Sequence, residues 1–314
     1  MIIFEFPKII KPNSIYELLN SLERAFSMEE QLVPDVIINL QKVRKTSLLG
    51  ILLNYKFIEY TYKQNCFKRP NLYINEYIEK EWERYGFTNL IHSFVSDKDL
   101  TERNYKNLKV KVDDRFIIAP QALLRSKHYS DKFLKSEFLP KIEEYYKKND
   151  KVVSMIFLCL SEILLNFWEH AVDDTNSILV AEGNENNIEI ACADTGNGII
   201  TTLNRVLENS STDRPGTLKK SVEKFVTSKK MTNHMGYGLW ILNQIASKTK
   251  GRFHIYSEGA FYHNNFGKEL AKKCGYWKGT IIYLSLPLKK PVTLSDIENH
   301  DNKKFNDIKI NWKE

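Results

Sequence analysis

Residues Val152 to Ala171 read V-V-S-M-I-F-L-C-L-S-E-I-L-L-N-F-W-E-H-A, and their apolar period predicts one long helix. The side of this helix expected to be buried carries Ile156, Leu160, Ile163, Leu164 and Phe167. Glu162, Asn166 and His170 follow at intervals of four and form a polar stripe. An amide oxygen suits Mg²⁺, and a carboxylate one turn earlier could orient or deprotonate a nucleophile. Taken alone, this stripe is better interpreted as an ordinary polar helix face.

The residues that follow predict a β-hairpin that ends in a glycine-containing turn. Ser177 to Ala181 and Ile188 to Ala193 have strand patterns, and G-N-E-N-N lies between them. The second strand runs into Asp194-Thr195-Gly196-Asn197-Gly198. A carboxylate fixed there could accept a hydrogen bond from an exocyclic amine, and the glycines allow a sharp bend against a flat ligand. The alternative is a plain Asp/Asn/Gly turn.

A third glycine motif, Gly236-Tyr237-Gly238-Leu239, directly precedes a helical pattern. Free N–H groups and the helix dipole at such a place favour a phosphate, although a lone G-x-G is weak evidence. Around these motifs we expect amphipathic helices within Gln121 to Tyr146, a helix over Ile199 to Leu207, a long polar loop to Met235, a helix over Leu239 to Ser247, and strands over Arg252 to Tyr256 and Thr280 to Leu286.

The order of these motifs resembles the GHKL ATPase superfamily, which includes gyrase B, the ninety-kilodalton heat-shock chaperones, MutL, histidine kinases and bacterial anti-sigma factor serine kinases. S-E-I-L-L-N-F-W-E-H-A resembles its N box, D-T-G-N-G its G1 box, G-Y-G-L its G2 box, and Gly279-Thr280 its last turn. The resemblance covers about residues 121 to 288. It implies a two-layer α/β sandwich with a mixed sheet that binds ATP and Mg²⁺.

The resemblance also implies a role for each matched position. Asn166 would ligand Mg²⁺, Asp194 would hold the adenine amino group, Gly196 and Gly198 would shape the base pocket, Gly236 and Gly238 would bring amides to the phosphates, and Thr280 would assist near the base. The loop from about Glu208 to Met235 would be the ATP lid. Lys229, in T-S-K-K, is placed to reach the terminal phosphates, and a solvated surface explains that lysine equally well.

Glu162 favours the branch of this superfamily that transfers phosphoryl groups. E-x-x-x-N-x-x-x-H is similar to the pattern of the anti-sigma factor kinases, which implies that Glu162 is the catalytic base. His170 would then lie near the phosphates, and a supporting or simply buried role is at least as good an interpretation. Trp240 departs from the family pattern, because many members have a third glycine there.

The N-terminal part alternates strand and helix patterns, which predicts a small α/β module. Asp35 to Leu53 resembles STAS domains, the partners of anti-sigma kinases, in which a phosphorylatable Ser or Thr stands at the start of a helix. Thr46 and Ser47 stand at that place. The alternative, ordinary N-capping of a helix, is the more common use of these residue types.

Composition supports a two-domain α/β protein: 314 residues with 42% hydrophobic content allow two cores. We expect domains over residues 1–115 and 116–290 and a polar tail over 291–314, since the segment from 97 to 114 is almost wholly polar. Four cysteines without C-x-x-C spacing argue against zinc and disulfides. The absence of a signal peptide or membrane segment predicts a soluble, cytoplasmic protein.

These observations predict a regulatory protein that binds Mg·ATP and hydrolyses it or phosphorylates Ser/Thr. The alternative is an ATP-gated conformational or dimerisation switch with little or no hydrolysis. The expected partner is another protein or the chain's own N-terminal module, and a homodimer is a further option. The net charge of +7 is spread along the chain, which disfavours nucleic acid.

Overall fold

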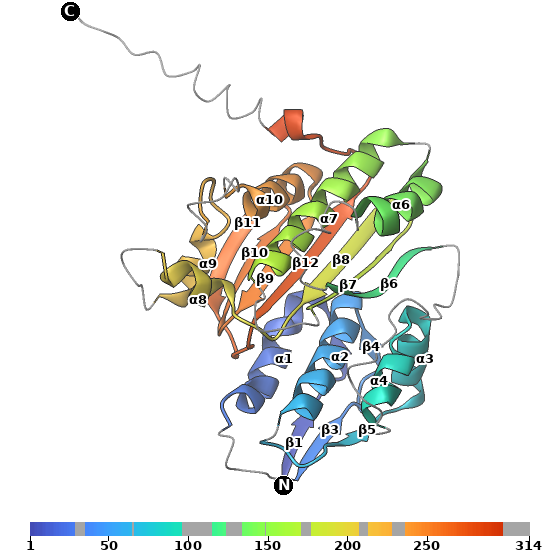
Figure 1. Ribbon diagram of the computed structural model, residues 1–314, viewed down its shortest axis with the longest axis vertical. Helices are drawn as coiled ribbons and strands as arrows, with labels where there is room; N and C mark the ends of the chain where they lie inside the picture. Colours follow the sequence, from blue (N-terminus) through green and yellow to red (C-terminus); the bar gives the residue numbers. More distant parts are fainter. Residues whose placement is uncertain are drawn as a thin grey trace, which may run out of the picture.

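The first part of the chain is a small α/β unit built on parallel strands (Figure 1). A computed structural model describes residues 1–28, 35–64, 66–95, 115–123, 134–147, 149–170, 177–206, 213–227 and 236–297. The three-stranded sheet has the order β1 (Ile2–Glu5), β3 (Val36–Asn39), β5 (Asn71–Tyr73), and β2 (Ile9–Ile10) pairs in parallel with β4 (Lys45–Thr46). The helices are α1 (Ile15–Leu22), α2 (Leu48–Lys63), α3 (Glu76–Tyr85) and α4 (Thr88–Val95), with 3-10 turns η1 (Pro12–Ser14) and η2 (Glu23–Phe26) beside α1. We call residues 1–95 the N-terminal unit.

Local sequence explains where the helices of this unit begin and end. The side chain of Ser47 accepts a hydrogen bond from the backbone N–H of Gly50 and caps α2. Asn75 caps α3 in the same way, and Gly86, with φ of 85°, ends that helix. Because α1 lies between β1 and β3 in the chain, and α2 between β3 and β5, the connections allow parallel pairing. The predicted α/β module is therefore confirmed as an α/β unit.

The second part of the chain forms a seven-stranded sheet in which every neighbouring pair is antiparallel. Its order is β11 (Lys268–Lys273), β10 (Ala260–Asn265), β9 (Arg252–Ser257), β12 (Thr280–Pro287), β8 (Asn187–Ala193), β7 (Ser177–Gly183), β6 (Phe116–Leu123). The expected mixed sheet is wrong. Tight hairpins join β7 to β8, β9 to β10 and β10 to β11, and such connections require antiparallel pairing.

Helices cover one face of this sheet. They are α6 (Leu139–Tyr146), preceded by the π-helical turn η5 (Leu134–Phe138), α7 (Asp150–His170), α8 (Ile199–Asn204), α9 (Arg214–Lys220) and α10 (Gly238–Thr249). The predicted hairpin and the helices and strands expected around Val152, Ile199, Leu239, Arg252 and Thr280 are confirmed within a few residues. Among the described helices, α7 is long and apolar enough over Asp150–Trp168 to cross a membrane. A helix in a protein core meets the same criterion, and α7 packs its apolar side on the sheet.

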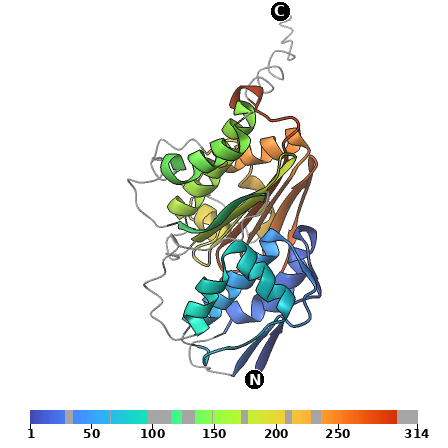
Figure 2. The same ribbon diagram turned by 90° about the vertical axis from the view of Figure 1, so that its right-hand side faces the viewer.

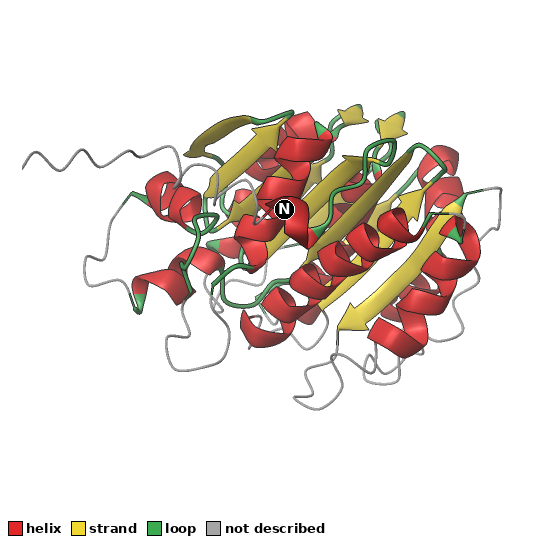
Figure 3. Cartoon of the chain, turned by 90° about the horizontal axis from the view of Figure 1, so that it is seen from above, coloured by secondary structure: helices red, strands yellow, loops and turns green. Residues whose placement is uncertain are grey.

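The N-terminal unit covers part of the opposite sheet face, so the expected two-layer arrangement is incomplete (Figure 2). Successive residues of β7 alternate between two hydrophobic clusters: Ile178 and Val180 pack with the N-terminal unit, and Leu179 packs with α7 and α10. Seen from above, helices lie on both sides of the strands (Figure 3). Helix α2 is buried on nearly all sides, because it packs on its own unit and on β7 and β8.

Three expectations about local structure need correction. Residues 121 to 123, expected in a helix, end strand β6, which pairs with β7. The segment from residue 208 to 235, expected as a loop, contains helix α9. The segment from 259 to 278, expected as an insertion that connects the last two strands, itself supplies β10 and β11 at the sheet edge. The polar segment from 97 to 114 lies outside the described residues.

Candidate functional site

The polar stripe of α7 meets the start of α10. A methyl group on Gly238 would lie 2.7 Å from Oε2 of Glu162 and 3.1 Å from Nδ2 of Asn166. Glycine is therefore what allows the two helices to approach so closely at this point. The Asn166 amide donates a 2.7 Å hydrogen bond to the backbone carbonyl of Glu162, and this leaves its oxygen as the atom presented away from the helix backbone.

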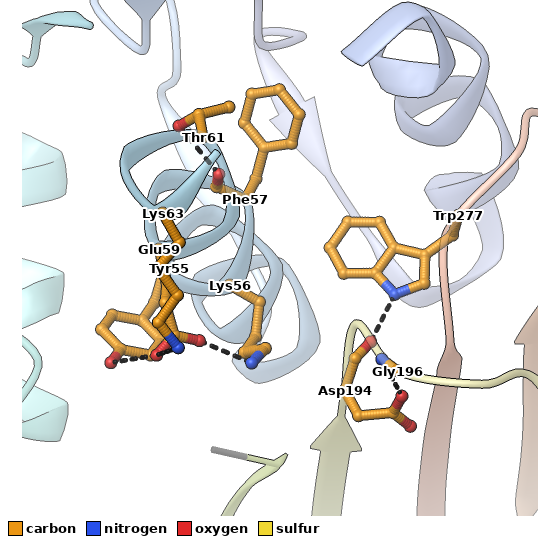
Figure 4. A network of polar contacts seen from close by, with 9 residues as sticks. All are labelled: Tyr55, Lys56, Phe57, Glu59, Thr61, Lys63, Asp194, Gly196 and Trp277. Atoms are coloured by element: carbon orange, nitrogen blue, oxygen red, sulfur yellow. Dashed lines mark hydrogen bonds and ion pairs between the residues drawn. The ribbon is translucent and has the colours of Figure 1, made fainter. Parts of the chain in front are cut away.

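Asp194 is buried at the end of β8 and is held by several hydrogen bonds. Its Oδ1 accepts from the backbone N–H of Gly196 at 2.7 Å, and its Oδ2 accepts from the backbone N–H of Thr280 at 3.2 Å. The indole N–H of Trp277 donates to the Asp194 carbonyl oxygen at 2.8 Å (Figure 4). The carboxylate therefore has a fixed orientation before any ligand binds.

The turn after Asp194 leads into α8. Side chains at the end of β9 form hydrogen bonds with the first residues of this helix. Ser257 accepts from the backbone N–H of Ile199 and donates to the carbonyl oxygen of Gly279. Glu258 accepts from both the backbone N–H and the hydroxyl of Thr201. A methyl group on Gly198 would overlap the Glu258 carboxylate, so glycine is required where this acid caps the helix.

Residues from the predicted motifs line one pocket between these elements. The lining residues are Asn166, Phe167, Asp194, Asn197, Ile199, Thr280 and Ile282. The cavity measures about 20 Å³, which is room for a water molecule. A purine base is far larger, so nucleotide entry requires the lining side chains to move apart. The pocket combines apolar walls with a few fixed polar groups, as small-molecule sites do.

A basic and aromatic cluster lies next to this pocket, at the start of α10. Nζ of Lys224 lies 4.8 Å from the ring centre of Trp240, 5.5 Å from that of Phe225 and 5.6 Å from that of Tyr237. Gly236, with φ of 70°, leaves no room for a side chain against the backbone of Phe225. Trp240, which departs from the family pattern, thus supports a lysine here.

Not every predicted site residue can be placed. Glu162, Asn166, Asp194, Gly196, Gly198, Gly238 and Thr280 come together around or beside the pocket, with Gly236 near the start of α10. His170 belongs to α7, but its side chain is outside the described residues. Lys229 also lies outside them. Burial and the charge of Glu162 raise the pKa of the nearby Cys159 thiol far above its usual value, so Cys159 is not a nucleophile here.

Sequence reasoning missed Trp277, Glu258 and Lys224 as supports of the site. A glycine pair before a helix signals a site directly, whereas Trp277 and Glu258 act through contacts between distant segments and Lys224 through contacts with aromatic rings. The only available signal was the position of Trp277 just before Gly279-Thr280. No protein-family model matches the chain, and comparison with curated proteins finds no match.

Proposed function

We propose that the chain binds Mg·ATP through a GHKL-type nucleotide fold in its second half. The observation that carries the proposal is the convergence of Asn166, Asp194 and Thr280 on one pocket, beside the start of α10 at Gly238. These positions come from helix, strand end and last strand, and they are far apart in the chain. Four ordered motifs that meet at one point are much stronger support than any one of them.

Each residue has chemistry that suits the proposed ligand. Asp194 would accept a hydrogen bond from the adenine amino group, with Gly196 and Gly198 shaping the turn beside the base. The first amides of α10 would face the phosphates, where the helix dipole favours negative charge. The amide oxygen of Asn166 fits Mg²⁺ as a hard ligand, and the metal would neutralise phosphate charge.

Glu162 supports a catalytic use of the nucleotide. Its carboxylate lies against the start of α10, where the terminal phosphates would be held, so it would orient an attacking water or hydroxyl. We therefore propose ATP hydrolysis or phosphorylation of Ser/Thr as the reaction. The cytoplasm is the proposed location.

The proposed test is calorimetry with Mg·ATP on the full chain. Wild-type protein should bind, Asn166→Ala should lose Mg²⁺-dependent binding, and Asp194→Asn should lose ATP while tripolyphosphate binding is retained, because Asp194 addresses the base. An exposed change, Glu143→Gln on α6, serves as the control. Unchanged Mg·ATP affinity in the Asn166 variant would sink the assignment.

The second candidate function is an ATP-gated switch with little hydrolysis. It is favoured by the shared sheet, since the N-terminal unit and the pocket lie on opposite faces of the same strands. Size measurement with and without a non-hydrolysable ATP analogue, beside a turnover assay, separates the two candidates. A size change without turnover favours the switch.

The N-terminal unit is proposed to be STAS-like, with Thr46 and Ser47 as its candidate phosphoacceptors. Two observations weigh against self-phosphorylation within one chain. Ser47 already caps α2, and the N-terminal unit packs on the sheet face opposite the pocket. Incubation with γ-labelled ATP and mapping of the label tests the point. Label on Ser47 or Thr46 supports phosphoryl transfer, and free phosphate alone favours an ATPase.

A further inference from the structure

The loop between β11 and β12 connects the N-terminal unit to the candidate pocket. We call residues Cys274–Gly279 the β11–β12 loop. Two contacts tie it to the N-terminal unit: the backbone N–H of Gly275 donates to Oδ1 of Asn20 at 2.5 Å, and that of Tyr276 donates to Oε2 of Glu23 at 3.2 Å. A methyl group on Gly275 would overlap the backbone of α1, so the approach is close.

The side chain of Trp277 contacts Asp194, one of the residues that line the pocket. It is fully buried, and its indole N–H donates to the carbonyl oxygen of Asp194. Its own carbonyl oxygen accepts from the backbone N–H of Glu258, the acid that caps α8. The side chain of Trp277 therefore supports Asp194, where the turn after β8 begins. The backbone of Trp277 supports Glu258, which caps α8 where that turn ends.

Aromatic rings continue this connection into the N-terminal unit. The ring of Trp277 lies 5.1 Å from that of Phe26, centre to centre, and Phe26 lies 4.6 Å from Tyr60 of α2. Rings at such separations pack as a unit and resist independent movement. These contacts form a continuous path from α2 and η2 to the carbonyl group of Asp194.

We propose that Trp277 is a positioning residue for ATP binding, and that contacts with the N-terminal unit hold the Trp277 side chain in place. The proposal rests on the proposed function, because it concerns how Asp194 meets the base. By thermodynamic linkage, any change in how the N-terminal unit packs on the sheet changes the affinity for ATP. ATP binding changes the stability of that packing by the same free energy.

The first test compares Trp277→Phe with Trp82→Phe by calorimetry on the full chain. Both tryptophans are buried, but the indole N–H of Trp82 has no hydrogen-bond partner among the described residues, so only the Trp277 change removes a bond seen there. Trp277→Phe should weaken ATP binding about tenfold or more and leave tripolyphosphate binding unchanged, because the buried Asp194 carbonyl oxygen loses the hydrogen bond from the Trp277 indole. Trp82→Phe should change neither. A general loss of structure would weaken both ligands alike.

The second test changes the N-terminal unit alone. Phe26→Leu should weaken ATP binding several-fold although Phe26 lies outside the pocket, because its ring packs on Trp277. Trp82→Phe, on α3, again serves as the control and should leave ATP binding unchanged. If wild-type protein binds no ATP, the proposed function and this inference both fall. If wild-type protein binds ATP and the Trp277 and Phe26 variants bind it equally well, only this inference falls.

Discussion

A methyl group on Gly279 would lie 2.6 Å from the carbonyl oxygen of Asp194 and would overlap Oδ1 of the same residue. Gly279 also has φ of 92°, in the left-handed region that side chains disfavour. The backbone of Gly279 is therefore packed tightly against Asp194, one of the residues that line the candidate pocket. A substitution at Gly279 can thus displace the carboxylate of Asp194 without changing Asp194 itself.

Gly279→Ala is expected to abolish ATP binding, because the new methyl group must displace the Asp194 carboxylate. The matched control is Gly267→Ala: Gly267 has φ of 91°, but its added methyl group would meet only Nζ of Lys250, at 3.8 Å. Both changes carry the same backbone strain, on the order of 1 kcal/mol. Calorimetry should show lost affinity in the first variant and wild-type affinity in the second. Equal affinities would show that Asp194 takes no part in ATP binding.

Glu162→Gln is expected to keep Mg·ATP affinity and lose turnover, roughly 10²- to 10⁴-fold, because the amide cannot accept a proton. The near-identical size of the side chain preserves the approach of Gly238. Phosphate release and calorimetry on the same preparation separate the two effects. Full turnover in this variant would show that Glu162 is not the base.

The buried ion pair of Lys56 and Glu59 in α2 should contribute to stability only as an intact pair. Their charged atoms lie 2.5 Å apart, with side chains 0% and 1% exposed (Figure 4). Lys56→Met is expected to lower the free energy of unfolding by about 3 kcal/mol, because Glu59 stays buried with fewer partners. Lys80 and Glu76 form an equally short but exposed pair, so Lys80→Met should have no measurable effect. Urea unfolding measures both; equal effects would contradict this account.

Two stacked histidines should make the protein less stable as the pH falls. Rings of His254 and His263 lie 3.8 Å apart on neighbouring strands, under the N-terminal unit. Burial lowers the pKa of His254 to about 4, with Arg252 adding to the effect, and lowers that of His263 to about 2, with His254 adding to it. Nε2 of His254 forms a hydrogen bond with the side chain of Asn265, and Nε2 of His263 forms one with the hydroxyl of Tyr256.

The sign follows from the lowered pKa values. Unfolded histidines bind protons below about pH 6.5, whereas the folded ones remain neutral, so stability is complete above that pH and falls below it. Each histidine should remove about 2 kcal/mol between pH 7.5 and 5. Urea unfolding of wild type and His263→Phe at both pH values measures the difference, and the variant should lose less. An equal loss would mean that His263 is not held neutral.

Sequence alone could predict the elements whose signals are local. The apolar period of α7, the G-N-E-N-N turn and the cap at Ser47 each act within a few residues. Strands β10 and β11 were not predicted, because the turns before them contain residues that are unusual in tight hairpins. Glu258-Gly259 and Phe266-Gly267 adopt positive φ at both positions, where Asn or Asp usually precedes Gly. Glutamate and phenylalanine gave no sign of a hairpin.

The candidate site divides in the same way. Asp194, Asn166 and the glycines could be found because their order along the chain is characteristic. Trp277 and Glu258 could not, because their importance arises from contacts with residues 83 and 57 positions away in the sequence. The covered sheet face was missed for a related reason: Ile178 and Val180 have the pattern of any buried strand, whichever partner covers them.

The central position of β12 has a consequence for how the protein is made. This strand pairs with both β8 and β9, yet it is the last of the sheet to be synthesised. Until Pro287 has left the ribosome, β8 and β9 cannot obtain their shared neighbour, so the growing chain carries two unfinished half-sheets. The N-terminal unit, made first, would meanwhile present α2 without its cover. Assembly of the pocket thus has to wait for the synthesis of β12.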